Sequence, residues 1–174
     1  AFNFPIWGML EKIAVNLMAG VAAVVKPSEY TSYLTELMVK EIIDSKILPE
    51  GSLQLIPGTG KGILDHVGHN DVVTFTGSAT TGKILKSHPN ILENSVPFNM
   101  EADSLNACVL GEDVDENSDE FSIFIKEVYR EMTAKTGQKC TAVRRILVPE
   151  NKIDQVQKAL ITKLEKTIIE NQEN

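Results

Sequence analysis

A cysteine in a turn of small residues is the side chain of this sequence best suited to covalent chemistry. Cys140 lies in residues 137–142, next to Lys139 and outside any apolar run. A thiolate attacks carbonyl carbons, and a neighbouring cation or a helix N-terminus increases the thiolate fraction of a cysteine. The pattern indicates a nucleophile at Cys140, with a small structural residue as the alternative. Cys108 lies within an apolar run, so the structural interpretation fits that cysteine better.

Two further polar residues, Glu101 and Asn3, adjoin apolar segments. Glu101 follows the apolar run at residues 96–100, and a glutamate at a strand end can act as a general base on water if burial raises its pKa. A solvated acid or an ion-pair partner is the alternative interpretation of Glu101. Asn3 lies between two phenylalanines, directly before a helix that Pro5 can begin. A buried amide there needs a partner, such as a substrate oxygen.

Two turns after predicted strands have residues that could bind a nucleotide. The turn at residues 75–82 leads into a helix, so its amides and hydroxyls can face a phosphate at the positive helix end. Lys26 and Glu29 follow an earlier strand and could hold ribose hydroxyls at the carboxyl edge of a sheet, with an exposed loop as the alternative. The glycine turn at residues 58–62 lacks the spacing of a P-loop or of the dinucleotide fingerprint.

The overall composition favours a protein that acts on small molecules. The 174 residues include 24 acidic and 17 basic side chains, and this net charge of -7 argues against nucleic acid or an anionic membrane as a partner. The two cysteines and three histidines have no disulfide or metal-ligand spacing, so we expect no metal site and a reducing, cytoplasmic location. No apolar stretch reaches the roughly 18 residues of a membrane span, and the apolar start lacks a signal-peptide pattern.

The first part of the chain must position most of these residues, and its pattern is that of an α/β protein. Apolar runs at residues 20–25, 52–56 and 72–76 alternate with amphipathic stretches. The runs are apolar throughout, as in parallel strands that helices cover on both faces. The sequence therefore predicts a doubly wound, mostly parallel, Rossmann-like sheet and a cofactor-binding domain at residues 1–101.

The second part, residues 102–174, is predicted to be the start of another α/β domain that contains the cysteine turn. Helical periodicity and apolar runs set its expected elements. In chain order these are a strand at 105–110, an acidic loop at 111–119, a helix at 121–136, a strand at 144–148, a helix at 153–169 and a polar tail at 170–174.

The order of these segments along the whole chain resembles the aldehyde dehydrogenase superfamily. The segments that carry the resemblance are residues 2–5, 26–29, 57–60 and 75–78, Glu101, and residues 137–140. Within the superfamily, residues 100–106 and 111–114 are most similar to the dehydrogenase domain of the bifunctional ring-opening proteins of phenylacetate catabolism. The chain departs from the family pattern at Ala102 and Asp103, which replace a glycine pair.

The resemblance implies a role for each site residue. Cys140 would form a thiohemiacetal and then a thioester with an aldehyde, while Asn3 and the Cys140 backbone amide would stabilise the oxyanion. Glu101 would activate the water that hydrolyses the thioester. The implied cofactor, NAD or NADP, would contact Lys26, Ser28 and Glu29 at its adenosine ribose, Gly77, Ser78 and Gly82 at its pyrophosphate, and the turn at Gly58.

The same resemblance implies an oxidoreductase that oxidises a small aldehyde, in this subgroup a CoA-linked semialdehyde, and that is a homo-oligomer at full length. The family's nicotinamide-ribose residues and oligomerisation strands lie outside residues 1–174, so we expect this segment to be inactive by itself. The alternatives are a CoA-acylating aldehyde dehydrogenase and an inactive nucleotide-binding fragment. Glu101 favours water over CoA, and Glu29 favours NAD by repelling a 2′-phosphate, whereas the similar subgroup is associated with NADP.

Overall fold

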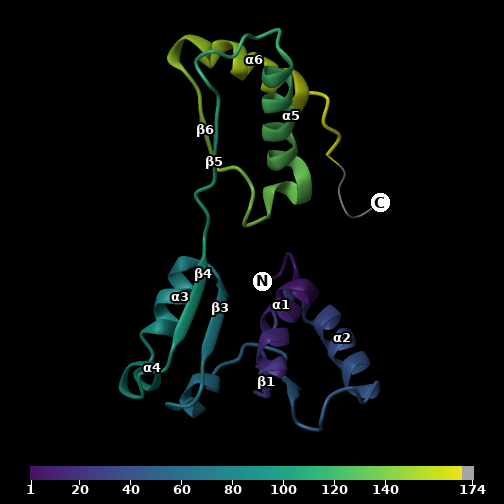
Figure 1. Ribbon diagram of the computed structural model, residues 1–174, viewed down its shortest axis with the longest axis vertical. Helices are drawn as coiled ribbons and strands as arrows, with labels where there is room; N and C mark the ends of the chain where they lie inside the picture. The colour runs from purple at the N-terminus through teal and green to yellow at the C-terminus, as the bar shows by residue number, and fades with distance from the viewer. Residues whose placement is uncertain (170–174) are drawn as a thin grey trace. The chain divides into compact units, whose positions relative to one another are not determined.

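The computed structural model describes residues 1–169, and the chain forms two compact units, Ala1–Asp103 and the part from Ser104 onward. Within the described residues, six strands pair in parallel, two by two, and helices pack against each pair (Figure 1). The strands are β1 (Ala23–Val25), β2 (Leu53–Leu55), β3 (Val73–Gly77), β4 (Phe98–Ala102), β5 (Ala107–Val109) and β6 (Arg145–Leu147). The predicted α/β class with parallel strands is confirmed.

Helices connect the two strands of each pair, because parallel neighbours cannot be joined by a tight turn. The α-helices are α1 (Pro5–Met18), α2 (Ser32–Asp44), α3 (Ala79–Lys86), α4 (Pro89–Glu93), α5 (Asp119–Thr133) and α6 (Ile153–Leu164). The 3-10 turns are η1 (Glu29–Thr31), η2 (Ile63–His66), η3 (Ala134–Gly137) and η4 (Glu150–Lys152). None of the described helices is long and apolar enough to span a bilayer.

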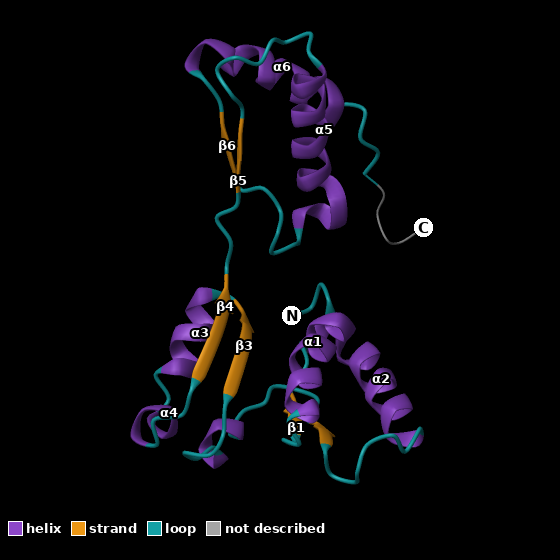
Figure 2. Cartoon of the chain, viewed as in Figure 1, coloured by secondary structure: helices purple, strands orange, loops and turns teal. Residues whose placement is uncertain are grey.

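The β1–β2 pair of the first unit has α1 and α2 beside it (Figure 2). The helix α1 begins at Pro5, as predicted, because the fixed φ of proline and its missing N–H suit a first helical turn. One face of the pair joins both helices in an apolar core. This core consists of Met9, Ile13, Ala23, Val39 and Leu53.

The β3–β4 pair of the same unit has α3 packed against both strands. The Ser78 hydroxyl caps α3 by accepting a hydrogen bond of 3.2 Å from the Thr81 N–H, so the predicted helix start after this strand is confirmed. The parallel register places Thr76 opposite Glu101. The end of β3 and the end of β4 therefore lie at one edge of the pair.

The second unit is built from the β5–β6 pair, α5 and α6. Ser118 caps α5 by accepting the Phe121 N–H at 3.2 Å, and the apolar face of this helix packs on α6 and on the inner face of the strand pair. The core residues are Leu110, Phe121, Phe124, Ile125, Val128, Val156 and Leu160. Val128 is fully buried, at 0% exposure.

The structure differs from the sequence-based expectation at strand faces and helix ends. Val24 of β1 is 56% exposed and Val109 of β5 is 67% exposed, so within the described residues one face of each of these strands carries no helix. Alternate side chains of a strand point to opposite faces, and the helices of each unit pack on one face only. The helix predicted at 121–136 ends at Thr133, and the one predicted at 153–169 ends at Leu164. The tail predicted at 170–174 lies outside the described residues.

Replacement of the buried core residue Val128 should destabilise the second unit. We expect Val128→Ala to lower the free energy of unfolding by about 2–3 kcal/mol, through lost burial and a residual cavity. Ile123→Ala is the matched control, because Ile123 lies on the same helix but is 59% exposed. Urea unfolding of both variants measures the difference, and equal losses would mean that this core does not limit stability.

Candidate active site

The turn that carries Cys140 begins with three successive residues in the left-handed region. Lys135, Thr136 and Gly137 have φ values of 52°, 54° and 70°. Only glycine adopts this conformation without cost, so the backbone at Lys135 and Thr136 is strained. The helix α5 ends at Thr133 because Ala134 is extended, the positive-φ residues follow, and Cys140 lies after them in an exposed turn.

Two side chains hold this turn through its backbone carbonyls. Asn106 Nδ2 donates to the Cys140 carbonyl at 2.6 Å and to the Ala142 carbonyl at 3.1 Å. Arg144 Nη2 donates to the Gly137 carbonyl at 3.0 Å and to the Lys139 carbonyl at 3.1 Å. Sequence analysis missed both residues, since nothing in local spacing connects position 106 to position 140.

Lys139, the lysine beside Cys140, forms an ion pair with a residue of α5. Lys139 Nζ lies 2.9 Å from both carboxylate oxygens of Glu131, and both side chains are only 16% exposed. The positive charge of Lys139 is therefore compensated by α5 rather than directed at Cys140. Lys139 fastens the turn to the helix, which differs from the expectation that this cation promotes the thiolate.

The second cysteine has the environment of a structural residue. Cys108 is half-buried in β5 and packs against the core of its unit. Burial raises the pKa of the Cys108 thiol, a nearby Glu127 carboxylate raises it further, and a backbone hydrogen bond with Val109 lowers it. Cys108 is thus kept in the protonated, unreactive form.

Glu101 is an ion-pair partner in this structure. Lys12 Nζ of α1 donates to Glu101 Oε1 at 2.9 Å, and Thr76 Oγ1 donates to Oε2 at 3.4 Å. The Lys12 hydrogen bond lowers the pKa of Glu101 despite the opposing effect of burial. The condition that burial raises this pKa is therefore not met, and the carboxylate is ionised and 57% exposed. Lys12 is the one basic residue of a mostly apolar helix, a signal that sequence analysis did not use.

Lys26 and the Gly58–Gly60 turn meet at the carboxyl edge of the β1–β2 pair. Lys26 Nζ lies 4.0 Å from Glu29 Oε1. A side chain at Gly60 would come within 2.9 Å of Lys26 Cγ, so the aliphatic stem of Lys26 lies across this turn. Gly58 has φ +93° and open space around it, and Ser28 directly precedes η1. Four of the predicted site residues are thus gathered in one corner of the first unit.

The start of α3 combines glycines with a carboxylate. A Cβ at Gly77 would lie 2.5 Å from Phe75 Cζ, and one at Gly82 would lie 2.4 Å from Met100 Sδ. Gly82 therefore lies where α3 packs closely on Met100 and Phe75 of the strands, and Gly77 lies against the Phe75 ring of its own strand. Asp103, with φ +55°, accepts a hydrogen bond of 3.3 Å from the Ala79 N–H at the first turn of α3. The acid that replaces a family glycine thus keeps a glycine-like backbone conformation.

Asn3 is half-buried in the turn that leads into α1. It belongs to the first unit, as Glu101 does, whereas Cys140 belongs to the second. Nine positions separate Asn3 from Lys12 along the same segment.

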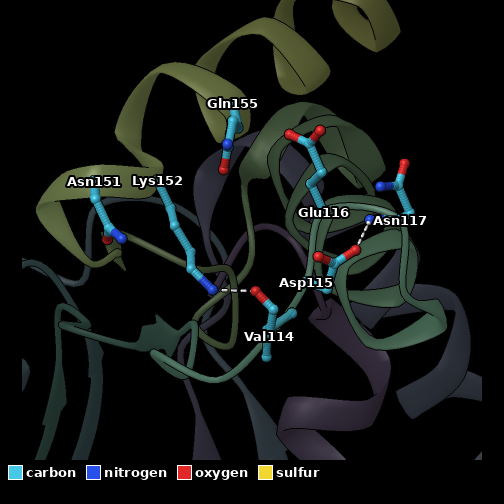
Figure 3. Close-up of a pocket in the computed structure, with 7 residues that line it drawn as sticks. All are labelled: Val114, Asp115, Glu116, Asn117, Asn151, Lys152 and Gln155. Atoms are coloured by element: carbon cyan, nitrogen blue, oxygen red, sulfur yellow. Dashed lines mark hydrogen bonds between the residues drawn. The ribbon is translucent and has the colours of Figure 1, made fainter.

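Two hollows of the second unit contain none of the predicted site residues. One, of about 270 Å³, is shown in Figure 3 and is lined by Val114, Asp115, Glu116, Asn117, Asn151, Lys152 and Gln155. The Lys152 ammonium donates to the Val114 carbonyl, so the basic group of this hollow is already engaged. Among residues 1–169, no group of three or more side chains is placed to hold a metal ion.

Comparisons with known proteins agree on one family for this chain. Residues 1–174 match the aldehyde dehydrogenase family. A 3,4-dehydroadipyl-CoA semialdehyde dehydrogenase of Aromatoleum evansii is 49% identical over 149 residues, which are 86% of this chain and 29% of that protein. Aldehyde dehydrogenase 1A1 of Homo sapiens is 31% identical over 98% of this chain and 33% of its own length. The chain therefore spans about a third of the length of the curated relatives it matches.

Solved structures support the same grouping. A betaine aldehyde dehydrogenase of Staphylococcus aureus, crystallised with NAD+, matches with a TM-score of 0.82 and 32% identity. The match covers 94% of this chain and 32% of that one. A lactaldehyde dehydrogenase structure has the same TM-score at 24% identity, with 95% and 34% coverage, and supports the fold alone.

The two cysteines should differ in reactivity. We expect a short iodoacetamide pulse on the folded protein to label Cys140 several times faster than Cys108, because Cys140 is exposed and burial raises the pKa of the Cys108 thiol. Peptide mass spectrometry reports both sites. Labelling in denaturant is the control and should be nearly equal at the two thiols. Equal or reversed labelling of the folded protein would contradict the nucleophile assignment.

Removal of the Lys12 ammonium should raise the pKa of Glu101. Because this pKa is lowered in the folded state, the ionised carboxylate stabilises the fold above its unfolded pKa, and this stabilisation is lost as the pH falls through the folded pKa. We expect Lys12→Met to shift the NMR titration of the Glu101 carboxyl to higher pH. The same variant should weaken the dependence of the free energy of unfolding on pH at acid pH. Lys40→Met, on an exposed position of α2, is the control. An unchanged titration would show that Lys12 does not hold the carboxylate in solution.

Proposed function

Because the chain belongs to the aldehyde dehydrogenase family, we propose that it supplies the nucleophile and the general base for oxidation of an aldehyde to a carboxylic acid. The observation that carries this proposal is the Cys140 turn, in which an exposed thiol sits on a backbone held by Asn106 and Arg144. The substrate we propose is a CoA-linked semialdehyde, since a relative 49% identical is named for that class of substrate.

In the first half of the reaction, the Cys140 thiolate forms a C–S bond to the aldehyde carbon, and the carbonyl π electrons move to the oxygen. The Cys140 backbone N–H and the Asn3 amide stabilise this oxyanion, and one such donor typically changes the rate about 10²- to 10³-fold. When bound, the oxidised nicotinamide supplies the acceptor for the hydride that leaves the carbon. Loss of the hydride reforms the carbonyl as a thioester of Cys140.

In the second half, Glu101 takes a proton from water, and the hydroxide oxygen attacks the thioester carbon. The C–S bond then breaks, which releases the carboxylic acid and restores the Cys140 thiolate. Lys12 and Thr76 keep the Glu101 carboxylate deprotonated and oriented, so a base is present before the thioester forms. The presence of Glu101 favours water over CoA as the acceptor of the acyl group.

The first unit would bind the dinucleotide at the carboxyl edges of its strand pairs. Lys26, Ser28 and Glu29, with the open Gly58 turn, have the charges and the space to hold the adenosine ribose. Gly77, Ser78 and Gly82 would lie by the pyrophosphate at the start of α3.

Two carboxylates affect which dinucleotide this edge accepts. The Asp103 carboxylate accepts the Ala79 N–H at the start of α3, so a pyrophosphate bound there would lie near a like charge. Glu29 would repel a 2′-phosphate and so favours NAD, which is also the cofactor in the complex of the S. aureus relative. A cytoplasmic location and a homo-oligomeric state belong to the same proposal.

Loss of the base should separate the two halves of the reaction. In protein expressed from the complete reading frame, we expect Glu101→Gln to form one equivalent of NAD(P)H in a burst and then to turn over about 10²- to 10⁴-fold more slowly, because the base is needed only after the thioester exists. Stopped-flow absorbance measures both phases.

Glu93→Gln is the matched control, since Glu93 is an exposed carboxylate of α4 outside the proposed site, and it should retain steady-state turnover. Asp103→Asn tests the other carboxylate of the same turn. If Glu101→Gln turns over normally and Asp103→Asn stops after a burst, then Asp103 is the base. Loss of the burst in Glu101→Gln would place the role of Glu101 before hydride transfer.

A further inference from the structure

We infer that Asn106 and Arg144 are positioning residues that fix the direction of the Cys140 backbone N–H, the proposed oxyanion donor, and this inference rests on the proposed function. Within residues 1–169, neither side chain makes a hydrogen bond with the Cys140 thiol. Both act on carbonyl groups of the turn, on either side of the nucleophile.

The two side chains form a clamp on the turn. Arg144 Nη2 is shared between the Gly137 and Lys139 carbonyls, at 3.0 and 3.1 Å, and its Nε lies 3.4 Å from the Ser104 hydroxyl. Asn106 Nδ2 is shared between the Cys140 and Ala142 carbonyls, at 2.6 and 3.1 Å. One guanidinium and one amide therefore bind four carbonyls between positions 137 and 142.

Because a trans peptide is planar, a contact that fixes the direction of its carbonyl also fixes the direction of its N–H group. Within one peptide unit, the C=O and the following N–H point in opposite directions, and the unit does not twist appreciably. Because Arg144 binds the Lys139 carbonyl, the Cys140 N–H must point away from the guanidinium. Because Asn106 binds the Cys140 carbonyl, the Thr141 N–H points away from the amide.

The Cys140 N–H is also left available for a ligand. Within residues 1–169, it donates to no protein acceptor, whereas the nearby Ala142 N–H donates to the Lys139 carbonyl at 3.2 Å. A donor that is oriented before the reaction stabilises a developing oxyanion without a reorganisation cost. The clamp thus supports the oxyanion and leaves the nucleophilicity of the sulfur unchanged.

Because the clamp should affect the oxyanion and not the sulfur, the inference can be tested in protein expressed from the complete reading frame. We compare Arg144→Met and Asn106→Leu with the wild type in two reactions of the same cysteine. The first is single-turnover NAD(P)H formation with an aldehyde, which passes through an oxyanion. The second is alkylation of Cys140 by iodoacetamide, which does not. Lys158→Met, which removes a charge from an exposed position of α6, is the control.

We expect each clamp variant to slow NAD(P)H formation by about 10²- to 10³-fold, the usual effect of one lost oxyanion donor, and to change the alkylation rate by less than about threefold. Arg144→Lys should recover part of the rate, because an ammonium can bind one of the two carbonyls. A parallel fall in both reactions would assign the clamp a purely structural role and overturn the inference. An unchanged NAD(P)H rate would also overturn it.

A measurement that needs no turnover separates this inference from the proposed function. The NMR order parameter of the Cys140 N–H should be about 0.85 in the wild type and should fall below about 0.6 in Arg144→Met. A wild type that has the rigid N–H but forms no NAD(P)H with any aldehyde would overturn the proposed function, whereas a mobile N–H in an active wild type would overturn the clamp.

Discussion

Parallel pairing of the strands is the constraint on which the rest of this structure depends. A parallel pair needs a crossover helix, and its two carboxyl ends meet at one edge. In the first unit, that edge collects Lys26 after β1 and the Gly58 turn after β2. The same rule puts Ser78 after β3 and registers Thr76 with Glu101. Within each pair of the first unit, the candidate residues at or just after the strand ends are therefore brought together by topology, because that is where the chain leaves the sheet.

Cys140, the proposed nucleophile, depends on a different constraint, a strained turn that is held from both sides. Non-glycine residues in the left-handed region cost about 1–3 kcal/mol each, and Lys135 and Thr136 are two in succession. Hydrogen bonds to charged groups contribute about 1.5–3 kcal/mol, so the Arg144 contacts are of the size needed to offset this strain. The Lys139–Glu131 pair, mostly shielded from water, adds a second attachment to α5. The turn keeps its shape because its backbone carbonyls, rather than the Cys140 side chain, are held.

Local pattern was enough to predict the α/β class, the helix start at Pro5 and the helix that follows the strand at residues 72–76, because propensity and capping act within a few residues. The same patterns could not indicate that Lys12 binds Glu101 or that Asn106 binds the Cys140 carbonyl, since those pairs are 89 and 34 positions apart. The early end of α5 was missed because Lys135 and Thr136 have ordinary helical propensity, whereas both adopt positive φ in the structure. The roles of the predicted site residues remain predictions, although their positions are described.

In the proposed role of Glu101 as general base, its contact with Lys12 would have two opposed effects. A base must be deprotonated when it is required, and the Lys12 ammonium ensures this by lowering the pKa of the carboxyl group. The same lowering weakens the carboxylate as a proton acceptor. Because the Glu101 side chain is 57% exposed, it is not confined by packing to this one position. A carboxylate that moves away from Lys12 loses the interaction that lowers its pKa, so its basicity rises in the conformation that is free to contact water. Lys12 therefore sets a deprotonated resting state, and the strength of the base depends on how completely that ion pair is broken when water is activated.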